Sequence, residues 1–389
     1  MRIAVIKESV AFERRVPIVP DSIKRLSQKK ISVVVERGAG EGALAFDTDY
    51  ESAGAKVLPS AAAVIAEANC VLRLRVPSVP EVMALREGCT LVAPILPLVN
   101  TDLVRALAER KVDTIALDAI PRTTVAQMMD VLSSQATCAG YYAVVMAAGL
   151  LPKFFPMLIT AAGTIAPATL LVLGAGVAGL SAIGTGKRLG ARVEAFDVRK
   201  VAKEQVESLG AKFVEIASDE DAQTAGGYAK EVSDEYKKRQ AEVLAKHAAK
   251  ADAIVCTALI PGRRAPLLIT EEMVKSMRPG SVIVDLAAEQ GGNCALTEPG
   301  KTVVKHRVTI IGAVDLPSHV SVHASHMWSR NMEKLLFHLS KDGAFAIDNL
   351  AQQGDEIVRG SLITRSGDIV HEGARAALVQ AERVEAKAS

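Results

Sequence analysis

Three glycines follow a strand-like apolar run near the middle of the chain. Gly174, Gly176 and Gly179 have the spacing Gly-x-Gly-x-x-Gly, directly after the run 169–174 and at the start of a helical pattern. In such a motif the first glycine permits a tight turn, the second lets a pyrophosphate approach the backbone, and the third lets helix and strand pack closely. The helix N-terminus supplies N–H groups and a positive dipole to the phosphates. The spacing therefore predicts a dinucleotide-binding site.

Asp197 indicates which dinucleotide is bound. It lies at the end of the next strand-like run, 192–198, where a carboxylate can bind both hydroxyls of an adenosine ribose. Arg199, two residues later, raises the question of a 2′-phosphate ligand. Because Asp197 would repel that phosphate, we expect NAD(H) rather than NADP(H).

A second group of polar residues interrupts the apolar segment 122–144. Its small and apolar residues recur every three to four positions, which is the pattern of an amphipathic helix. Four polar side chains lie among them: Arg122, Gln127, Asp130 and Ser133. From the pattern alone they are either the solvated face of a helix or ligands for a bound molecule.

None of the seven histidines lies near either group. Dehydrogenases that act on alcohols or amines move a proton as well as a hydride, usually through a positioned His or Lys. Three histidines, His319, His323 and His326, fall on one possible helix face at spacings that could bind zinc. Since no matched acidic or cysteine ligand stands nearby, we expect no metal site.

The elements that must position these residues form two strand–helix series. Strands of the first are expected at 2–8, 31–38, 70–76, 90–95 and 112–120, with helices at 21–30 and 101–111. Strands of the second are expected at 169–174, 192–198, 211–216, 252–259, 281–287 and 307–313. The prediction is an α/β protein of two Rossmann-like, doubly wound, mostly parallel sheets separated by a cleft.

We place the domain boundaries where one series gives way to the other. The N-terminal domain is expected at 1–134, completed by the tail 328–389, whose short strand patterns at 356–364 and 367–373 are too small for a third domain. The NAD(H)-binding Rossmann domain is expected at 135–327.

Composition excludes several functional classes. The 46 basic and 44 acidic residues nearly cancel, and no basic stripe is interleaved with aromatics, so we expect no nucleic-acid partner. Five scattered cysteines favour a reduced cytosolic compartment. The start of the chain is no signal peptide, and Pro156 and Pro167 interrupt the most apolar segment. We therefore expect a soluble protein that does not itself insert into a membrane.

The chain resembles the soluble, separately encoded alpha subunit of proton-translocating NAD(P) transhydrogenase, within the alanine dehydrogenase/transhydrogenase superfamily. The resemblance covers nearly the whole chain and rests on these motifs: "ERRVPIVP", "PRTTVAQMMDVLSSQATCAGYYAV", "VLGAGVAGL", "FDVR", "AGGYAKEVSDEY", "TALIPGRRAP" and "VDLAAEQGGNC". It implies a Re/Si-specific exchange of hydride between NAD(H) on this chain and NADP(H) on a partner subunit, coupled to proton translocation by transmembrane subunits. It also implies a homodimer that is cytoplasmic and peripheral to the inner face of the membrane through these partners.

The resemblance assigns roles to the polar stretch and to a loop. Arg122, Gln127, Asp130 and Ser133 match residues around the nicotinamide, with Tyr141 close by, and Tyr228 matches the tyrosine of a mobile loop that closes over the nucleotide. The catalytic set is therefore Arg122, Gln127, Asp130, Ser133 and Tyr228. The remaining residues expected to contact NAD(H) are Gly174, Ala175, Gly176, Val177, Gly179, Asp197, Val198, Arg199, Gly227 and Leu259.

The sequence departs from the family pattern at three positions. Val125, Tyr142 and His319 stand where the family has arginine. Contacts made by those arginines to partner subunits or to the loop are therefore not carried over to this chain.

Two other functions stay open. Alanine dehydrogenase shares the fold, but its active-site lysine before a proline corresponds to Arg75 here, and the region 92–100 lacks its histidine. A non-enzymatic NAD(H)-binding module is the second alternative. Hydride exchange is favoured over both, because two nicotinamides exchange only a hydride and need no acid–base residue.

Overall fold

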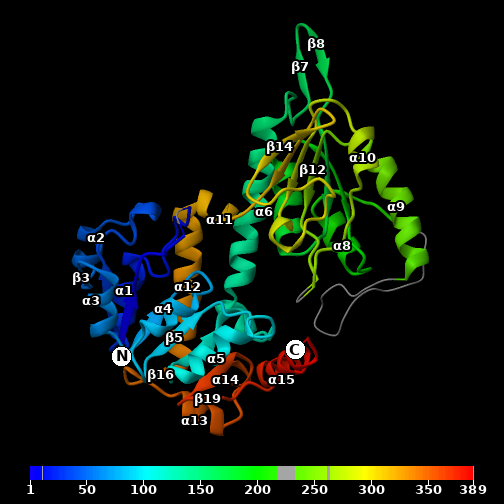
Figure 1. The fold of residues 1–389 in the computed structure, drawn as a ribbon. Helices are drawn as coiled ribbons and strands as arrows, with labels where there is room; N and C mark the ends of the chain where they lie inside the picture. Colours follow the sequence, from blue (N-terminus) through cyan, green and yellow to red (C-terminus); the bar gives the residue numbers. More distant parts are fainter. Residues whose placement is uncertain (11, 217–232, 261–262, 389) are drawn as a thin grey trace. The chain divides into compact units, whose positions relative to one another are not determined.

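The computed structural model describes residues 1–10, 12–216, 233–260 and 263–388, with side chains up to residue 383. The chain divides into two compact units (Figure 1). Unit 1 comprises Met1–Gln135 and Ser318–Ser389, and unit 2 comprises Ala136–Pro317. The chain passes from unit 1 into unit 2 after Gln135, within one residue of the expected boundary. It returns to unit 1 at Ser318, ten residues before the expected boundary, and we call these two passages the first and second crossings. The return is early because helix α12 (Ser321–Leu339) packs as a whole on elements of unit 1.

An eight-stranded sheet runs through the described residues of unit 1, in the order β19-β18-β6-β5-β4-β1-β2-β3. Six strands are parallel: β1 (Arg2–Val5), β2 (Ser32–Glu36), β3 (Lys56–Leu58), β4 (Cys70–Leu72), β5 (Thr90–Ala93) and β6 (Asp113–Ala116). The tail adds two antiparallel strands at the β6 edge, β18 (Leu362–Arg365) and β19 (Asp368–Ile369). The C-terminal tail thus completes the N-terminal sheet.

Helices cover both faces of this sheet, and a separate apolar cluster lies between the sheet and the helices on each face. They are α1 (Pro20–Gln28), α2 (Asp47–Ser52), α3 (Ala61–Glu67), α4 (Val79–Met83), α5 (Thr101–Glu109), α12, α13 (Ile347–Gln352), α14 (Glu356–Ser361) and α15 (Glu372–Ala388). The smaller elements are the 3-10 turns η1 (Glu41–Ala43), η2 (Leu117–Ala119) and η3 (Ala126–Met129) and the hairpin β16 (Ser340–Lys341)–β17 (Ala344–Phe345). Short α11 (Leu316–His319) spans the second crossing.

Unit 2 contains, in its described residues, a seven-stranded sheet in the order β11-β10-β9-β12-β13-β15-β14. Its parallel strands are β9 (Thr169–Leu173), β10 (Arg192–Phe196), β11 (Lys212–Phe213), β12 (Ala253–Cys256), β13 (Val282–Asp285) and β15 (Val308–Gly312). Strand β14 (Thr302–Lys305) pairs antiparallel with β15. The order of the strands changes direction at β9, which lies between β10 and β12. Ligands of open α/β sheets bind at such switch points.

The helices of unit 2 are α7 (Val177–Arg188), α8 (Ala202–Ser208), α9 (Asp234–Ala248) and α10 (Glu271–Ser276), with the turn η4 (Ala288–Gln290). Helix α6 (Val131–Leu150) carries the chain from unit 1 into unit 2. The hairpin β7 (Leu158–Thr160)–β8 (Gly163–Ile165) projects from unit 2 (Figure 1).

The predicted α/β class with two mostly parallel sheets is confirmed. Every residue of the central strands β5, β6, β12 and β13 is buried, as expected of parallel strands covered on both faces. The strand expected over 356–364 is wrong over its first six residues. Residues Glu356–Ser361 form α14, because the Asp355 side chain accepts a hydrogen bond from the Val358 N–H and caps a helix there. The expected cleft stays a prediction.

Candidate functional site

The glycine loop has the geometry that its spacing predicts. Gly174 follows β9 with a φ of +97°, a left-handed conformation that favours glycine. A Cβ on Gly179 would lie 1.9 Å from the Gly174 carbonyl oxygen, so only glycine allows α7 to approach the turn this closely. The Thr257 hydroxyl donates to the same carbonyl oxygen at 2.9 Å. Thr257 directly follows β12, the neighbour of β9 in the sheet, so this bond fixes the turn to the adjacent strand.

The backbone before α7 is accessible at its second glycine. Gly176 is the N-cap residue of α7, and a Cβ placed there would meet no atom of the described residues within 4 Å. Packing inside the chain therefore does not require this glycine. The open backbone at this glycine, directly before the first residue of α7, Val177, is the feature that the dinucleotide-binding motif requires of its second glycine.

Asp197 is buried and fully engaged with the protein. Its Oδ2 accepts from the Ala175 N–H at 2.7 Å and from Arg199 Nη2 at 2.8 Å, while Oδ1 accepts from Arg199 N and Nε, both at 2.8 Å. The hydrogen bonds and the charge of Asp197 raise the pKa of Arg199, although burial lowers it. A carboxylate has about four acceptor positions. If Asp197 binds both ribose hydroxyls, the Arg199 side chain must therefore first release the carboxylate.

The other expected contacts on the adenosine side are only partly described. Val198 is half-buried directly after Asp197, and Leu259 is 39% exposed in the loop after β12. Gly227 and Tyr228 lie outside the described residues.

Two polar residues missed by the sequence interpretation hold the loop that carries Leu259. Asn293 is fully buried, and its side chain donates to the Ala258 and Pro266 carbonyl oxygens and accepts from the Ala258 N–H. Asp285 in turn accepts from the N–H groups of Asn293 and Cys294. The motif "VDLAAEQGGNC" contains both residues, so a signal for them was present in the sequence.

The polar stretch is not one continuous helix, which corrects the expectation for 122–144. The 3-10 turn η3 ends at Met129, Asp130 is extended with φ −76° and ψ 92°, and α6 begins at Val131. Asp130 Oδ1 accepts from the Ser133 N–H at 2.9 Å, Oδ2 accepts from the Ser133 hydroxyl at 2.6 Å, and the Asp130 carbonyl accepts from the Ser134 N–H. Asp130 is therefore the N-cap of α6.

This break brings the four predicted nicotinamide residues together. Arg122, Gln127, Asp130 and Ser133 line one hollow of about 170 Å³, together with Pro121 and Ala126. Complete ligand pockets measure roughly 300–1,000 Å³, so the hollow fits one ring rather than a whole dinucleotide. Asn331 of α12 donates from Nδ2 to the Met128 carbonyl at 2.8 Å and holds η3 in place. Sequence spacing contained no indication of Asn331.

Helix α6 also contacts the glycine-loop helix within unit 2. A Cβ on Gly140 would lie 2.0 Å from the Ala178 carbonyl oxygen, and the Ser181 hydroxyl donates to the Thr137 carbonyl at 2.8 Å. Gly140 is therefore needed for the close contact between α6 and α7. The helix that Asp130 caps is thus packed against the helix that follows the glycine loop.

The histidine pattern does not form one helix face. His319 ends α11, whereas His323 and His326 are exposed on α12. Within the described ranges no group of three or more His, Cys, Asp or Glu side chains is placed to hold a metal ion.

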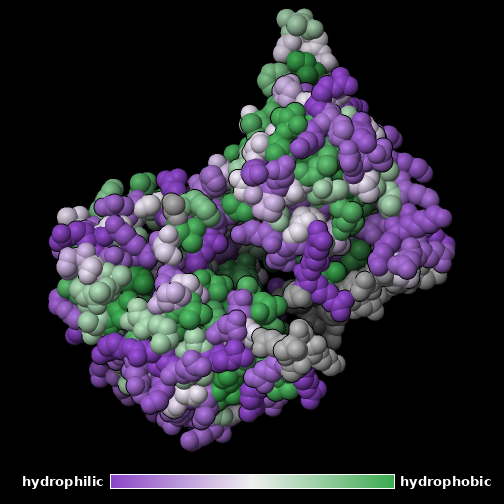
Figure 2. Space-filling view, viewed as in Figure 1, coloured by the Kyte–Doolittle hydropathy of each residue, from purple (hydrophilic) through white to green (hydrophobic). Residues whose placement is uncertain are grey.

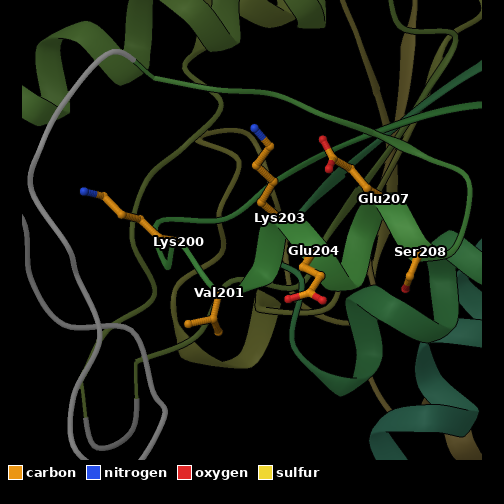
Figure 3. A pocket seen from close by; sticks show the side chains of 6 residues that line it. All are labelled: Lys200, Val201, Lys203, Glu204, Glu207 and Ser208. Atoms are coloured by element: carbon orange, nitrogen blue, oxygen red, sulfur yellow. The ribbon is translucent and has the colours of Figure 1, made fainter.

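An open hollow of about 440 Å³ lies along α8, lined by Lys200, Val201, Lys203, Glu204, Glu207 and Ser208 (Figure 3). Lys203 and Glu207 point to the same side of α8, and Lys203 forms an ion pair with Glu215. Charges of both signs offer no concentrated positive site for a phosphate. We assign this hollow no ligand.

A search of the described residues for membrane-spanning helices finds none of sufficient length and apolar character.

Two family models together match most of the chain. The model "Alanine dehydrogenase/PNT, N-terminal domain" matches residues 4–139, and "Alanine dehydrogenase/PNT, C-terminal domain" matches residues 143–372. The first portion of NAD(P) transhydrogenase subunit alpha from Rhodospirillum rubrum is 47% identical over 379 residues, covering 95% of this chain and 98% of the relative. The crystal structure of transhydrogenase from Sinorhizobium meliloti is 40% identical, with a TM-score of 0.82, covering 96% of this chain and 99% of that one.

An alanine dehydrogenase of Methanococcus maripaludis is a more distant relative. It is 30% identical over 297 residues, covering 75% of this chain and 74% of its own length. Membership of such a family implies a nicotinamide nucleotide-binding site, which the glycine loop fits. Both halves of the sequence, and the fold of both units, place this chain in the alanine dehydrogenase/PNT family.

Proposed function

We propose that this chain is the NAD(H)-binding subunit of an NAD(P) transhydrogenase and exchanges hydride with NADP(H) bound by a partner subunit. The hollow lined by Arg122, Gln127, Asp130 and Ser133 carries the proposal. Its described lining contains no His or Lys, and its carboxylate, Asp130, is hydrogen-bonded to Ser133 as the N-cap of α6. A reaction between two nicotinamides needs alignment and exclusion of water rather than proton transfer.

The proposed roles divide between the two units. In unit 1, Arg122, Gln127 and Asp130 orient the carboxamide and ribose at the nicotinamide end. In unit 2, the glycine loop and Asp197 bind the pyrophosphate and the adenosine ribose, which favours NAD(H) over NADP(H). Tyr228, outside the described residues, is proposed to close over the nucleotide. Nearly full-length similarity to a transhydrogenase subunit supports these assignments.

The contacts of Arg75 argue against an alanine dehydrogenase. Its Nε donates to the buried carboxylate of Glu13 at 2.8 Å. A guanidinium does not deprotonate in proteins, so Arg75 cannot replace an acid–base lysine. The region 92–100, which covers the end of β5 and the loop after it, contains no histidine.

We therefore expect the protein, mixed with an NADP(H)-binding transhydrogenase subunit, to exchange hydride between NADH and an NADP⁺ analogue. With NADH, pyruvate and ammonium it should show no turnover above background. Absorbance assays of both reactions decide between the two functions. Alanine formation without hydride exchange would establish the alternative, and NADH binding without either reaction would indicate a non-enzymatic module.

The proposed assembly is a homodimer that is cytoplasmic and peripheral to a membrane through transmembrane partner subunits. The exposed apolar side chains of the β7–β8 hairpin support a contact with a second copy. Ile159 is 77% exposed and Ile165 is 43% exposed, and the hairpin shows an apolar end in Figure 2. Apolar surface of this kind is buried in stable interfaces.

We expect Ile159→Glu to weaken dimerisation by about tenfold or more, because the contact would bury a charge in place of an apolar side chain. Light scattering after gel filtration at several concentrations measures the effect. The matched control is Val304→Glu on edge strand β14, where Val304 is 68% exposed. Equal effects of both substitutions, or of neither, would contradict a hairpin interface.

A further inference from the structure

A buried carboxylate near the start of the chain is bound by two arginines. The Glu13 side chain is 0% exposed and accepts from Arg15 Nε at 2.7 Å, from Arg15 Nη2 at 2.5 Å and from Arg75 Nε at 2.8 Å. The Ser318 hydroxyl also donates to Glu13 at 2.6 Å. Although burial raises it, the bonds and charge of Arg15 lower the pKa of Glu13 to about 2. Glu13 is therefore an ionised carboxylate at physiological pH, and with Arg15 it forms a buried ion pair.

The ion pair of Glu13 and Arg15 is attached to the N-terminal part of α6 by one side chain, Gln135. Arg15 Nη1 donates to Gln135 Oε1 at 2.9 Å, and Gln135 Nε2 donates to the Ala324 carbonyl of α12 at 3.1 Å. Gln135 is 7% exposed and lies five residues after Asp130. The guanidinium of Arg15 also lies over the Trp328 ring at 5.7 Å from its centroid. Arg15 is thus fixed on several sides, and the position of Gln135 follows from it.

We propose that Glu13 and Arg15 are positioning residues for hydride transfer, which they serve by holding the N-terminal part of α6 through Gln135. Asp130 caps this end of α6 and Ser133 lies in its first turn, and both line the proposed nicotinamide hollow. The inference rests on the proposed function. A charge-assisted pair inside the protein is stiffer than a solvated contact, and a displacement of reacting groups by about 1 Å can cost 100-fold in rate.

Neighbouring contacts supply two matched controls. Ser318 also binds Glu13, but it lies at the second crossing, and its hydroxyl otherwise accepts from the backbone N–H of Arg14. Glu8 forms another buried arginine pair of unit 1, with Arg73 at 2.9 Å and side-chain exposures of 2% and 5%. That pair holds the backbone of Leu74 rather than α6.

The experiment compares Glu13→Gln and Gln135→Met with Ser318→Ala and Glu8→Gln in the full chain. Single-turnover hydride transfer with the NADP(H)-binding subunit should fall about tenfold or more in the first two variants, with NADH Kd changed by less than about threefold. Both controls should stay within about twofold of the unmodified chain. Gln135→Met keeps the ion pair and so tests the idea even if Glu13→Gln does not fold.

Rates that follow thermal stability across all four variants, or that are unchanged in Gln135→Met, would overturn the proposal. Amide hydrogen–deuterium exchange in peptides covering 126–136 tests the positioning role of Glu13 and Arg15 separately from the proposed function. If the unmodified chain exchanges no hydride, the proposed function fails, and the positioning role is then judged by hydrogen exchange alone. Faster hydrogen exchange in the two test variants but not in the controls supports it, and equal hydrogen exchange in all four excludes it.

Discussion

Asp130→Asn is expected to slow hydride transfer from NADH to the partner's NADP⁺ by about 100-fold, because a small misalignment of two rings has that cost. The substitution is informative because Asp130 has a second role as the N-cap of α6. Asn caps a helix about as well as Asp, so the unfolding free energy should change by less than about 0.5 kcal/mol. Much of the NADH affinity should remain, since the adenosine half binds elsewhere. Stopped-flow transfer and equilibrium NADH titration measure the two effects separately.

Asp355 offers a control for the capping role. It caps α14 through a hydrogen bond from the Val358 N–H at 2.9 Å and also contacts His338 at 3.0 Å. Asp355→Asn should therefore cost at least as much stability and leave the transfer rate unchanged. An unchanged rate in Asp130→Asn would mean that the carboxylate serves only to cap the helix.

Asp197→Ala is expected to weaken NADH binding by about 1–3 kcal/mol, the usual cost of losing a hydrogen bond to a charged group. This loss of binding free energy has two sources. The substitution removes the proposed hydrogen bonds from the ribose hydroxyls, and it removes the acceptor of the Ala175 N–H in the glycine loop. Because the repulsion of a 2′-phosphate also disappears, the preference for NADH over NADPH should narrow. Fluorescence titration with both nucleotides measures each affinity.

Arg199→Met distinguishes competition from assistance at the same carboxylate. Arg199 makes three hydrogen bonds to Asp197, two from its side chain and one from its backbone N–H. If the side chain must release Asp197 for NADH to bind, Arg199→Met should bind NADH at least as tightly as the unmodified chain. Comparable affinities of the unmodified chain for NADH and NADPH would contradict the assignment of Asp197.

The glycine loop and the central strands could be predicted because their signals are local. Buried parallel strands read as apolar runs, and Gly174 and Gly179 are required by contacts within a few residues of each other and with Thr257, directly after the neighbouring strand β12. The strands β3 and β14 were missed because they are short and contain no fully buried residue, so neither carries a long apolar run. The pairing of β18 with β6 joins residues about 250 positions apart, and no local pattern reports it.

The start of α6 shows where periodicity misleads. The apolar spacing runs through both η3 and α6, since a 3-10 turn and an α-helix differ by less than one residue per turn. The break is instead marked by Asp130 and Ser133, a capping pair that also read as candidate ligands. Asn331 and Gln135 were beyond reach for another reason, because their partners come from distant segments.

The discontinuity of unit 1 sets an order for events on the ribosome. The sheet of unit 2 is complete once Gly312 has been made, whereas β18 begins 50 residues later at Leu362. Strand β6 ends at Ala116, 246 residues before Leu362, so at about 5–20 residues per second its edge stays unpaired for roughly 12–50 s. Unpaired edges recruit other strands. The half of the chain that is made first is therefore the half that finishes last, and a nascent chain stalled before residue 362 exposes a strand edge that the finished protein covers.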